Sequence, residues 1–391
     1  MLVDQLKSGL DAPICLTWEL TYACNLACIH CLSSSGRRDP RELSTAECKA
    51  VIDELAKLQV FYVNIGGGEP TIRSDFFEII DYAVANGVGV KFSTNGSRID
   101  ADAAQRLSGS DYIDIQISLD GADRATNDTV RGDGSWDTAI TAMNNLRDAN
   151  FGQFKISVVM TRHNISQLDA FEALAAEYGA ELRLTRLRPS GRGADSWDEL
   201  HPTNAQQREL YNWIITRPNV LTGDSFFHLS ALGESLPGLN LCGAGRIVCL
   251  IDPVGEVYAC PFVLHDEFKA GSVRDAGGFT SVWRESDLFL SLREPQSPGA
   301  CGSCGSYDAC QGGCMAAKFF TGLPLDGPDP ECVWGNADDE LARIAAANDS
   351  SALKPSPGPG HSKPAAPTRS APTPVVLGRK APAMGNVRAS A

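Results

Sequence analysis

Thirteen cysteines constrain this chain more than any other feature of its sequence. An odd number of thiols cannot all pair as disulfides, and residues 1–11 carry acids and lack the apolar stretch of a secretory signal. In such a chain, clustered cysteines bind metal or perform redox chemistry more often than they form disulfides. We therefore expect a cytoplasmic protein with reduced thiols, whose cysteines indicate its function.

The composition allows a folded protein and narrows its partners. The chain has 391 residues, 43% of them hydrophobic and 21% charged, which suffices for two or three domains with sizeable cores. The formal net charge of −14 argues against nucleic-acid binding, because phosphate attracts basic surfaces. No apolar run approaches the roughly 18 residues that a membrane span needs, so we expect no membrane partner.

Apolar, β-rich runs alternate with segments of helical periodicity in the first half of the chain. This alternation predicts βαβ units and a parallel sheet, and leaves open a doubly wound sheet or a partial TIM barrel. Ser44 or Thr45, with Glu47 in the capping-box position, is expected to begin the first helix. The expected strands are 14–21, 60–65, 88–93, 112–118, 155–160 and 182–187, and the expected helices are 45–58, 75–85, 100–107, 136–148, 167–178, 204–216 and 337–347.

The composition changes twice toward the C-terminus. Residues from about 235 to 335 are rich in Cys and Gly, and such a segment needs metal clusters in place of a large apolar core. Residues 351–391 contain six Lys or Arg and no Asp or Glu, with many Pro, Ala, Ser and Gly, which predicts a disordered tail. We therefore expect three regions, 1–230, 231–347 and 348–391.

Cys24, Cys28 and Cys31 follow the first expected strand with the spacing CxxxCxxC. Three thiolates at this spacing can each bind one corner of a [4Fe–4S] cluster, because thiolate is the soft ligand that such clusters prefer. The fourth iron is then open to a substrate or cofactor. A loop that follows a parallel strand also lies at the end of the sheet where ligands bind.

With this motif the chain resembles the radical S-adenosylmethionine (SAM) superfamily, which implies an α/β fold with a partial (β/α)6 TIM-type barrel over 1–230. In that superfamily the open iron binds the methionine end of SAM, and one electron from the reduced cluster releases a 5′-deoxyadenosyl radical that abstracts hydrogen from substrate. The segment GGGEP, residues 66–70, ends the second strand as the ammonium-binding segment of the family does. Glycines permit close backbone approach, and a carboxylate suits an ammonium.

The resemblance also implies SAM contacts after the third and fourth strands. Each of these short motifs alone is compatible with an ordinary strand-end turn, but their order after successive strands favours a SAM site. One position departs from the family, because His30 stands where an aromatic residue often packs on adenine; imidazole can still stack there. The implied SAM-binding residues are Gly67, Gly68, Glu69, Ser93, Asn95, Ser118, Asp120 and Arg131.

The cysteines of the C-terminal third are compatible with one or two structural zinc sites. Their spacing resembles that of the SPASM domain, which carries two auxiliary [4Fe–4S] clusters and would bring the total to three. A three-cysteine auxiliary cluster with an open iron is the alternative for the second set, and Cys15 and Cys48 are expected to be core thiols. The resemblance assigns one cluster to Cys301, Cys304, Cys310 and Cys332, and the other to Cys242, Cys249, Cys260 and Cys314.

Residues 16–38, around the first motif, are similar to those of mycofactocin radical SAM maturases. This resemblance implies a small precursor peptide as substrate, with oxidative decarboxylation of its C-terminal Tyr and then carbon–carbon bond formation to the preceding Val. Only 23 residues precede Cys24, too few for a leader-binding module, so a separate leader-binding carrier protein is expected. A reductant protein is expected as electron donor.

Other functions remain open from the sequence. Another SPASM enzyme, for quinone-cofactor, thioether-peptide or sulfatase maturation, would share the cluster ligands, whereas a non-catalytic iron–sulfur electron carrier would not need the GGGEP segment. No catalytic acid or base can be named. Arg186, Arg188 and Arg192 lie around the end of the sixth expected strand; we expect them to be solvated surface charges, with binding of a peptide carboxylate as the alternative.

Overall fold

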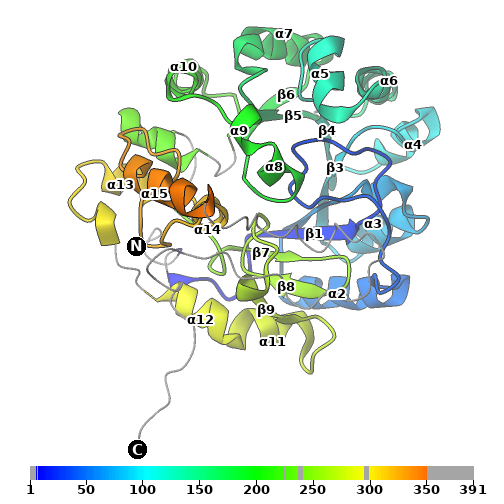
Figure 1. The fold of residues 1–391 in the computed structure, drawn as a ribbon. Coiled ribbons are helices and arrows are strands. Elements are labelled where there is room, and N and C mark those ends of the chain that lie inside the picture. Colours follow the sequence, from blue (N-terminus) through cyan, green and yellow to red (C-terminus); the bar gives the residue numbers. More distant parts are fainter. Residues whose placement is uncertain are drawn as a thin grey trace, which may run out of the picture.

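The protein folds around one nine-stranded sheet in a computed structural model that describes residues 6, 8–152, 154–222, 226–236, 241–294 and 299–349 (Figure 1). The strand order is β6-β5-β4-β3-β2-β1-β7-β8-β9, which does not close into a full barrel. The first six strands are parallel neighbours in chain order. They are β1 (Cys15–Thr21), β2 (Tyr62–Gly67), β3 (Gly89–Thr94), β4 (Ile113–Ser118), β5 (Lys155–Met160) and β6 (Glu181–Arg186), each within two residues of its expected range.

Helices connect the parallel strands, as the alternation predicts. The expected ones are present as α2 (Thr45–Lys57), α3 (Phe76–Ala85), α4 (Ala101–Leu107), α6 (Ser135–Asp148) and α7 (Leu168–Tyr178). Helix α2 begins at the predicted capping box, in which Ser44 and Glu47 each accept the other's backbone N–H with a side-chain oxygen. Helix α5 (Arg124–Arg131) was not predicted, because its sequence RATNDTVR carries no apolar stripe.

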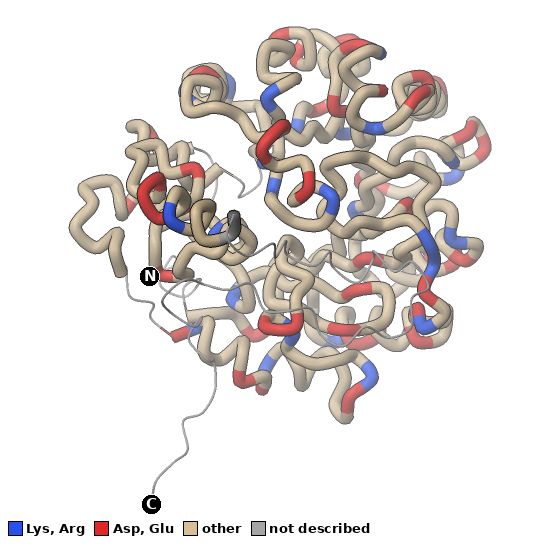
Figure 2. The backbone as a smooth tube through the Cα atoms, in the orientation of Figure 1, with Lys and Arg blue, Asp and Glu red and all other residues tan. Residues whose placement is uncertain are grey.

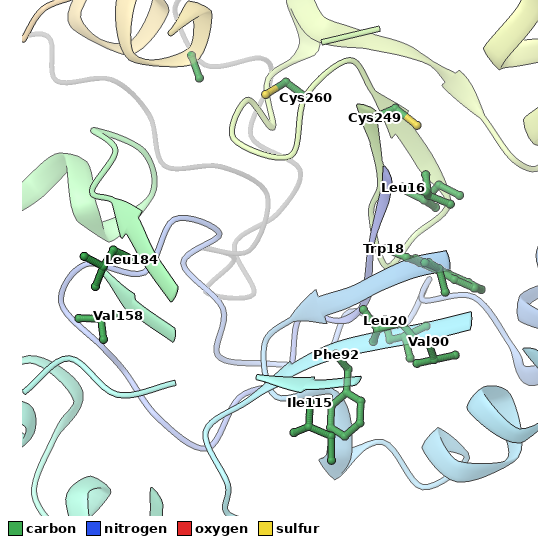
Figure 3. Close-up of a cluster of buried hydrophobic side chains, with 14 of the residues drawn as sticks. Leu16, Trp18, Leu20, Val90, Phe92, Ile115, Val158, Leu184, Cys249 and Cys260 are labelled. Atoms are coloured by element: carbon green, nitrogen blue, oxygen red, sulfur yellow. The ribbon is translucent and has the colours of Figure 1, made fainter. Parts of the chain in front are cut away.

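The hydrophobic core alternates along the strands. In β1 the buried side chains of Leu16, Trp18 and Leu20 pack into the same core as Phe92 and Ile115 (Figure 3). The residues between them in β1, Thr17 and Glu19 among them, face the other side of the sheet, because successive side chains of a strand point to opposite faces. The polar side of β1 therefore remains available for a functional site.

Three further strands extend the sheet beyond β1, and the sequence did not predict them. Strand β7 (Val248–Ile251) is parallel to β1, with Cys15 opposite Val248. Strands β8 (Glu256–Tyr258) and β9 (Lys269–Ser272) then add in antiparallel pairs. These strands have only three or four residues each, which is too short for a period-2 pattern to stand out.

Short helices occupy the rest of the described chain. Those expected over 204–216 and 337–347 are present as α10 (Asn204–Ile214) and α15 (Asp338–Asp349). The others are α8 (Arg192–Asp195), α9 (Trp197–Leu200), α11 (Gly278–Glu285), α12 (Asp287–Arg293), α13 (Tyr307–Cys310) and α14 (Met315–Thr321). Acidic and basic residues are interspersed over the backbone (Figure 2). From residue 350 onward, the expected tail lies outside the described residues.

None of the helices in the described part of the chain is both long enough and apolar enough to cross a lipid bilayer.

Candidate active site and iron–sulfur cluster sites

The first cysteine motif forms a loop directly after β1. Cys24, Cys28 and Cys31 lie within electrostatic reach of one another. Burial raises the pKa of Cys24 to about 11, so the free thiol is protonated at neutral pH and iron must displace that proton. The loop thus gathers three thiols that can each bind one corner of a four-iron cluster.

The cysteines do not surround a single ion position. Among the described residues, no three or more His, Cys, Asp or Glu side chains are arranged to hold one metal ion. Ligands of a zinc site share one ion, whereas each cysteine of a [4Fe–4S] cluster binds a different iron.

Arg192, which follows the edge strand β6, fixes the cysteine loop through hydrogen bonds. Its Nε donates to the carbonyl of Cys28 at 2.8 Å, and its Nη1 donates to the carbonyl of Ser35 at 2.9 Å. Its backbone N–H donates to the carbonyl of Cys31 at 2.9 Å. The segment after β6 therefore fixes the backbone of the loop that carries the three thiols.

The glycines of GGGEP bring the end of β2 against the loop that follows β1. A Cβ on Gly68 would lie 1.9 Å from the carbonyl oxygen of Ala23, and Gly67 has a φ of +109°. The Gly68 N–H donates to the carbonyl of Thr21 at 2.8 Å. Gly66, by contrast, has open space where its Cβ would be. Only glycine fits at Gly68, so the segment can lie beside the cysteine loop as a ligand cradle.

Glu69 is buried and enclosed by hydrogen-bond donors. Its Oε1 accepts from the Thr94 hydroxyl and its Oε2 from the Asn95 backbone N–H, each at 2.7 Å. Burial raises the pKa of Glu69, although these hydrogen bonds oppose that shift. The Asn95 side chain donates to Asn25 of the cysteine loop at 2.9 Å. Glu69 and Asn95 therefore join the ends of β2 and β3 to the loop.

Asp120, just after β4, is fully buried between the side chains of His30 and Arg131. Its Oδ2 lies 2.8 Å from His30 Nε2 and 2.6 Å from Arg131 Nε, and its Oδ1 accepts from the Val159 N–H at 2.7 Å. Burial acts to raise the pKa of Asp120, but the charges of Arg131 and His30 hold it well below its usual range. Asp120 thus makes internal contacts that orient His30 and Arg131. The Arg131 carbonyl lies 4.0 Å from the sulfur of Cys28.

Ser93 and Ser118 are half-buried at or next to the carboxyl ends of β3 and β4. The structure therefore brings every residue that was implied for SAM binding to the end of the parallel strands that carries the cysteine loop. Two of these residues, Glu69 and Asp120, have their carboxylates engaged by protein donors.

The cysteines of the C-terminal third form two sets. Cys301 lies within electrostatic reach of Cys304, Cys310 and Cys332. Cys260 lies within electrostatic reach of Cys242 and Cys314. Burial raises the pKa of both Cys301 and Cys260, as in the first loop. Except for Cys249, these are the sets that the sequence predicts.

Cys249 is not brought to either set. It lies fully buried in β7, opposite Leu16 of β1, and its side chain points away from that of Cys260 (Figure 3). Its electrostatic neighbours are Cys15 and Arg293. The uninterrupted apolar run of β7 is the sequence signal for this core position. In the structure the second set thus comprises Cys242, Cys260 and Cys314, with Cys249 apart from it.

The arginines at and after the end of β6 are not surface charges, so that expectation is wrong. Arg186 and Arg188 are 5% and 4% exposed, and Arg192 is half-buried. Arg186 pairs with Asp329 at 2.9 Å and with Glu331. These acids lie in the C-terminal segment that covers the end of β6. The sequence does not predict this contact, because the two segments are more than 140 residues apart.

The Asp329 carboxylate also accepts from the backbone N–H of Cys314 at 2.8 Å. Its own backbone carbonyl accepts from the N–H of Cys332 at 2.9 Å. Asp329 therefore connects a barrel strand, through Arg186, to one cysteine of each auxiliary set.

Comparisons with known proteins agree with this arrangement. A family model of the radical SAM superfamily matches residues 18–175, and one of the SPASM iron–sulfur cluster-binding domain matches residues 242–305. Mycofactocin maturase MftC of Mycolicibacterium smegmatis is 66% identical over 93% of this chain and 91% of its own length. MftC of Mycobacterium tuberculosis is 67% identical over 88% of each chain.

Solved structures share the fold at low sequence identity. SuiB of Streptococcus suis, bound to S-adenosylmethionine, has a TM-score of 0.69 and 20% identity over 83% of this chain and 78% of its own. The structure of anSMEcpe with bound AdoMet and a Cp18Cys peptide has a TM-score of 0.63 and 15% identity over 85% of this chain and 99% of its own. With a loop of three cysteines after β1, a C-terminal SPASM domain and two-thirds identity to those relatives, the chain belongs to the mycofactocin maturases of the radical SAM superfamily.

Proposed function

We propose that this chain modifies the C-terminal Val-Tyr of a ribosomal precursor peptide in mycofactocin biosynthesis. The proposed reaction is oxidative decarboxylation of the Tyr, followed by formation of a carbon–carbon bond to the Val. The observation that carries the proposal is the 66% identity to a mycofactocin maturase over 93% of the chain. Among the relatives and solved structures described above, none outside the mycofactocin maturases has a comparable sequence identity to this chain.

Cys24, Cys28 and Cys31 would hold the first cluster, which with SAM bound would supply a 5′-deoxyadenosyl radical for hydrogen abstraction from the substrate. In this proposal the backbone carbonyls of Gly67 and Gly68 accept from the SAM ammonium, because glycine lets the backbone come close. Arg131 meets the SAM carboxylate, as a guanidinium suits a carboxylate.

The remaining SAM-site residues shape the rest of the pocket. Ser93, Asn95 and Ser118 lie where strand ends can meet the ribose hydroxyls. The carboxylates of Glu69 and Asp120 act indirectly, because each is already held by donors of the protein. Glu69 fixes the GGGEP segment, and Asp120 orients Arg131 and His30.

Two auxiliary [4Fe–4S] clusters complete the proposal. One is held by Cys301, Cys304, Cys310 and Cys332, and the other by Cys242, Cys260 and Cys314 with one iron free of cysteine. Oxidative decarboxylation removes two electrons from the peptide, one with the abstracted hydrogen atom and one from the resulting radical. A nearby auxiliary cluster is a suitable acceptor for the second electron.

The partners follow from the same proposal. A separate carrier protein presents the leader of the precursor peptide, and a reductant protein supplies electrons to the first cluster. Both events take place in the cytoplasm, where thiols stay reduced until iron binds them.

The test is an anaerobic assay of the protein with reconstituted clusters, SAM, a strong reductant, the carrier and a peptide that ends in Val-Tyr. We expect 5′-deoxyadenosine, and a peptide that is lighter by carbon dioxide and two hydrogens. Cys24→Ala is the control and is expected to form no 5′-deoxyadenosine. Formation of 5′-deoxyadenosine with an unchanged peptide would refute the substrate, and no 5′-deoxyadenosine from fully iron-loaded protein would favour the electron-carrier alternative.

A further inference from the structure

Four Lys or Arg residues are buried in the described part of the chain, and only two of them have carboxylate partners there. Arg73 pairs with Asp75, and Arg186 pairs with Asp329 and Glu331. The other two are Arg188 and Lys318, at 4% and 5% exposure, for which the described residues provide no salt bridge. Burying a cation without an anion is strongly destabilising, so each position calls for a negative group.

Arg188 lies between the first cysteine loop and an auxiliary cysteine set. Its guanidinium stacks 3.4 Å from the ring centre of Phe262, two residues after Cys260. On the other side, Ser190 donates to the carbonyl of Leu32 at 3.0 Å, which ties the same segment to the first loop. The neighbouring Arg186 pairs with Asp329 and Glu331, whereas no salt bridge to Arg188 is present among the described residues.

The hydrogen-bonding capacity of Arg188 is also only partly used. Nη1 donates to the Arg186 carbonyl at 3.1 Å, whereas Nε and Nη2 are buried and have no hydrogen-bond acceptor among the described residues. Buried N–H groups of a charged side chain are rarely left without an acceptor. The electrostatic reach of Arg188 includes Cys260.

Lys318 lies between the two auxiliary cysteine sets, as Arg188 lies between the first cysteine loop and one of those sets. It belongs to α14, which begins directly after Cys314, and its backbone N–H donates to the Cys314 carbonyl at 3.1 Å. Its ammonium donates to one backbone carbonyl, that of Gly327, at 3.3 Å. Its charge reaches Cys242 of one set and Cys301 of the other.

We propose that Arg188 and Lys318 are positioning residues that neutralise the auxiliary clusters and raise their reduction potentials. A four-iron cluster with thiolate ligands carries net negative charge, and its potential depends on nearby charge and on hydrogen bonds to sulfur. Arg188 offers both to the cluster on Cys242, Cys260 and Cys314, and Lys318 offers charge to both clusters. The inference rests on the proposed function, in which these cysteines hold clusters. Its effect is to make the auxiliary clusters better acceptors of the substrate's electron.

The test is a potentiometric titration of the fully iron-loaded enzyme without substrate. Electron paramagnetic resonance spectra monitor the reduction of each cluster. Signals that change on addition of SAM belong to the first cluster and are set aside. We expect Arg188→Gln and Lys318→Gln to shift an auxiliary midpoint potential to more negative values. Arg188→Lys, which keeps the charge, should shift it less. Lys49→Gln is the matched control, since it removes a surface cation on α2 that pairs with Glu78, and should leave every potential unchanged.

The outcomes separate this inference from the proposed function. Wild-type protein that takes up iron for one cluster only would refute the auxiliary clusters themselves. If Arg188→Gln holds its full iron content and its auxiliary potentials are unchanged, the inference is overturned while the proposed function stands. If that variant also binds the Val-Tyr peptide more weakly, Arg188 is assigned to a peptide carboxylate instead. If Arg188→Gln fails to retain its clusters, an unchanged potential in Lys318→Gln overturns the inference.

Discussion

Single residues at the strand ends determine the geometry of the candidate site, because they let neighbouring backbone segments lie in close contact. Gly68 lies against the carbonyl of Ala23, and Glu69 is enclosed by donors from the next strand. Sequence reasoning identified both positions through the GGGEP segment. It did not foresee that the carboxylates of Glu69 and Asp120 are engaged inside the protein, because hydrogen-bond partners from distant strands leave no local sequence signal.

Gly68→Ala tests the close approach. The added methyl would lie 1.9 Å from the Ala23 carbonyl, so the cysteine loop and the GGGEP segment must separate. We expect 5′-deoxyadenosine formation to fall on the order of 100-fold, since a displacement of about 1 Å can cost that much. Gly66→Ala is the matched control, because it has open space, and should change the rate by less than about threefold. Equal rates for the two variants would contradict this account of the segment.

Glu19 gives a pH dependence of stability. Burial and the charge of Asp252 raise the pKa of Glu19 to about 8, although a hydrogen bond from Ser33 acts to lower it. A carboxyl whose pKa is higher in the folded state stabilises the fold at low pH and loses that contribution as pH rises from the unfolded pKa toward 8. Between pH 6.5 and 8.5 the loss amounts to about 2 kcal/mol.

Glu19→Gln should remove that loss, because an amide stays neutral. Anaerobic chemical unfolding at pH 6.5 and 8.5 measures it: the wild type is expected to weaken with rising pH more than the variant. Glu177→Gln, on the exposed side of α7, should keep the wild-type slope. The same slope in Glu19→Gln as in wild type would show that Glu19 is ionised throughout.

Elements differ in how far the sequence predicted them. Strands β1 to β6 and most connecting helices follow from strong periodicity, and their bounds agree within two residues. Helix α5 and strands β7 to β9 were missed, because the first lacks an apolar stripe and the others are very short. The burial of Arg186 was missed because its acid partners lie beyond residue 325, and that of Arg188 because it stacks on Phe262; no local pattern connects either segment to β6.

The link between β6 and the C-terminal segment predicts a large stability effect. Arg186→Met would leave Asp329 and Glu331 buried without their cation, which is expected to cost about 3–5 kcal/mol. Arg106→Met, which breaks an exposed pair with Asp81, should cost about 1 kcal/mol or less. Chemical unfolding of the loaded proteins measures both. In Arg186→Met, the auxiliary clusters should lose their iron before the first cluster does. Equal stabilities of the two variants would refute the role of the link.

The whole molecule shares one sheet between its two iron–sulfur regions. The family models match residues 18–175 and 242–305, yet β7 from the second region pairs along β1 from the first. The division at residue 230 remains a prediction for the domain boundary. In the sheet itself, β1 is a central strand only because β7 is present.

A chain that ends at residue 230 should therefore not fold stably. It would leave β1 as an exposed edge and would lack the buried residues Leu250, Ile251 and Val257. We expect aggregation on expression and little anaerobic iron uptake. A chain that ends at residue 349 keeps every described strand and should bind iron like the full chain. A soluble, iron-binding 1–230 fragment would show that the barrel strands form an independent unit.

The position of β1 in the sheet also sets an order for biosynthesis. Its first partner, β2, is made soon afterwards, but its second partner, β7, emerges only after Ile251 has been translated. Arg192, which holds the loop of Cys28, is made late as well. The nascent chain therefore carries an unfinished iron site for more than half of its synthesis. Iron–sulfur assembly factors are expected to act only after β7 has emerged, and a ribosome-bound chain that is stalled before β7 should accept little iron.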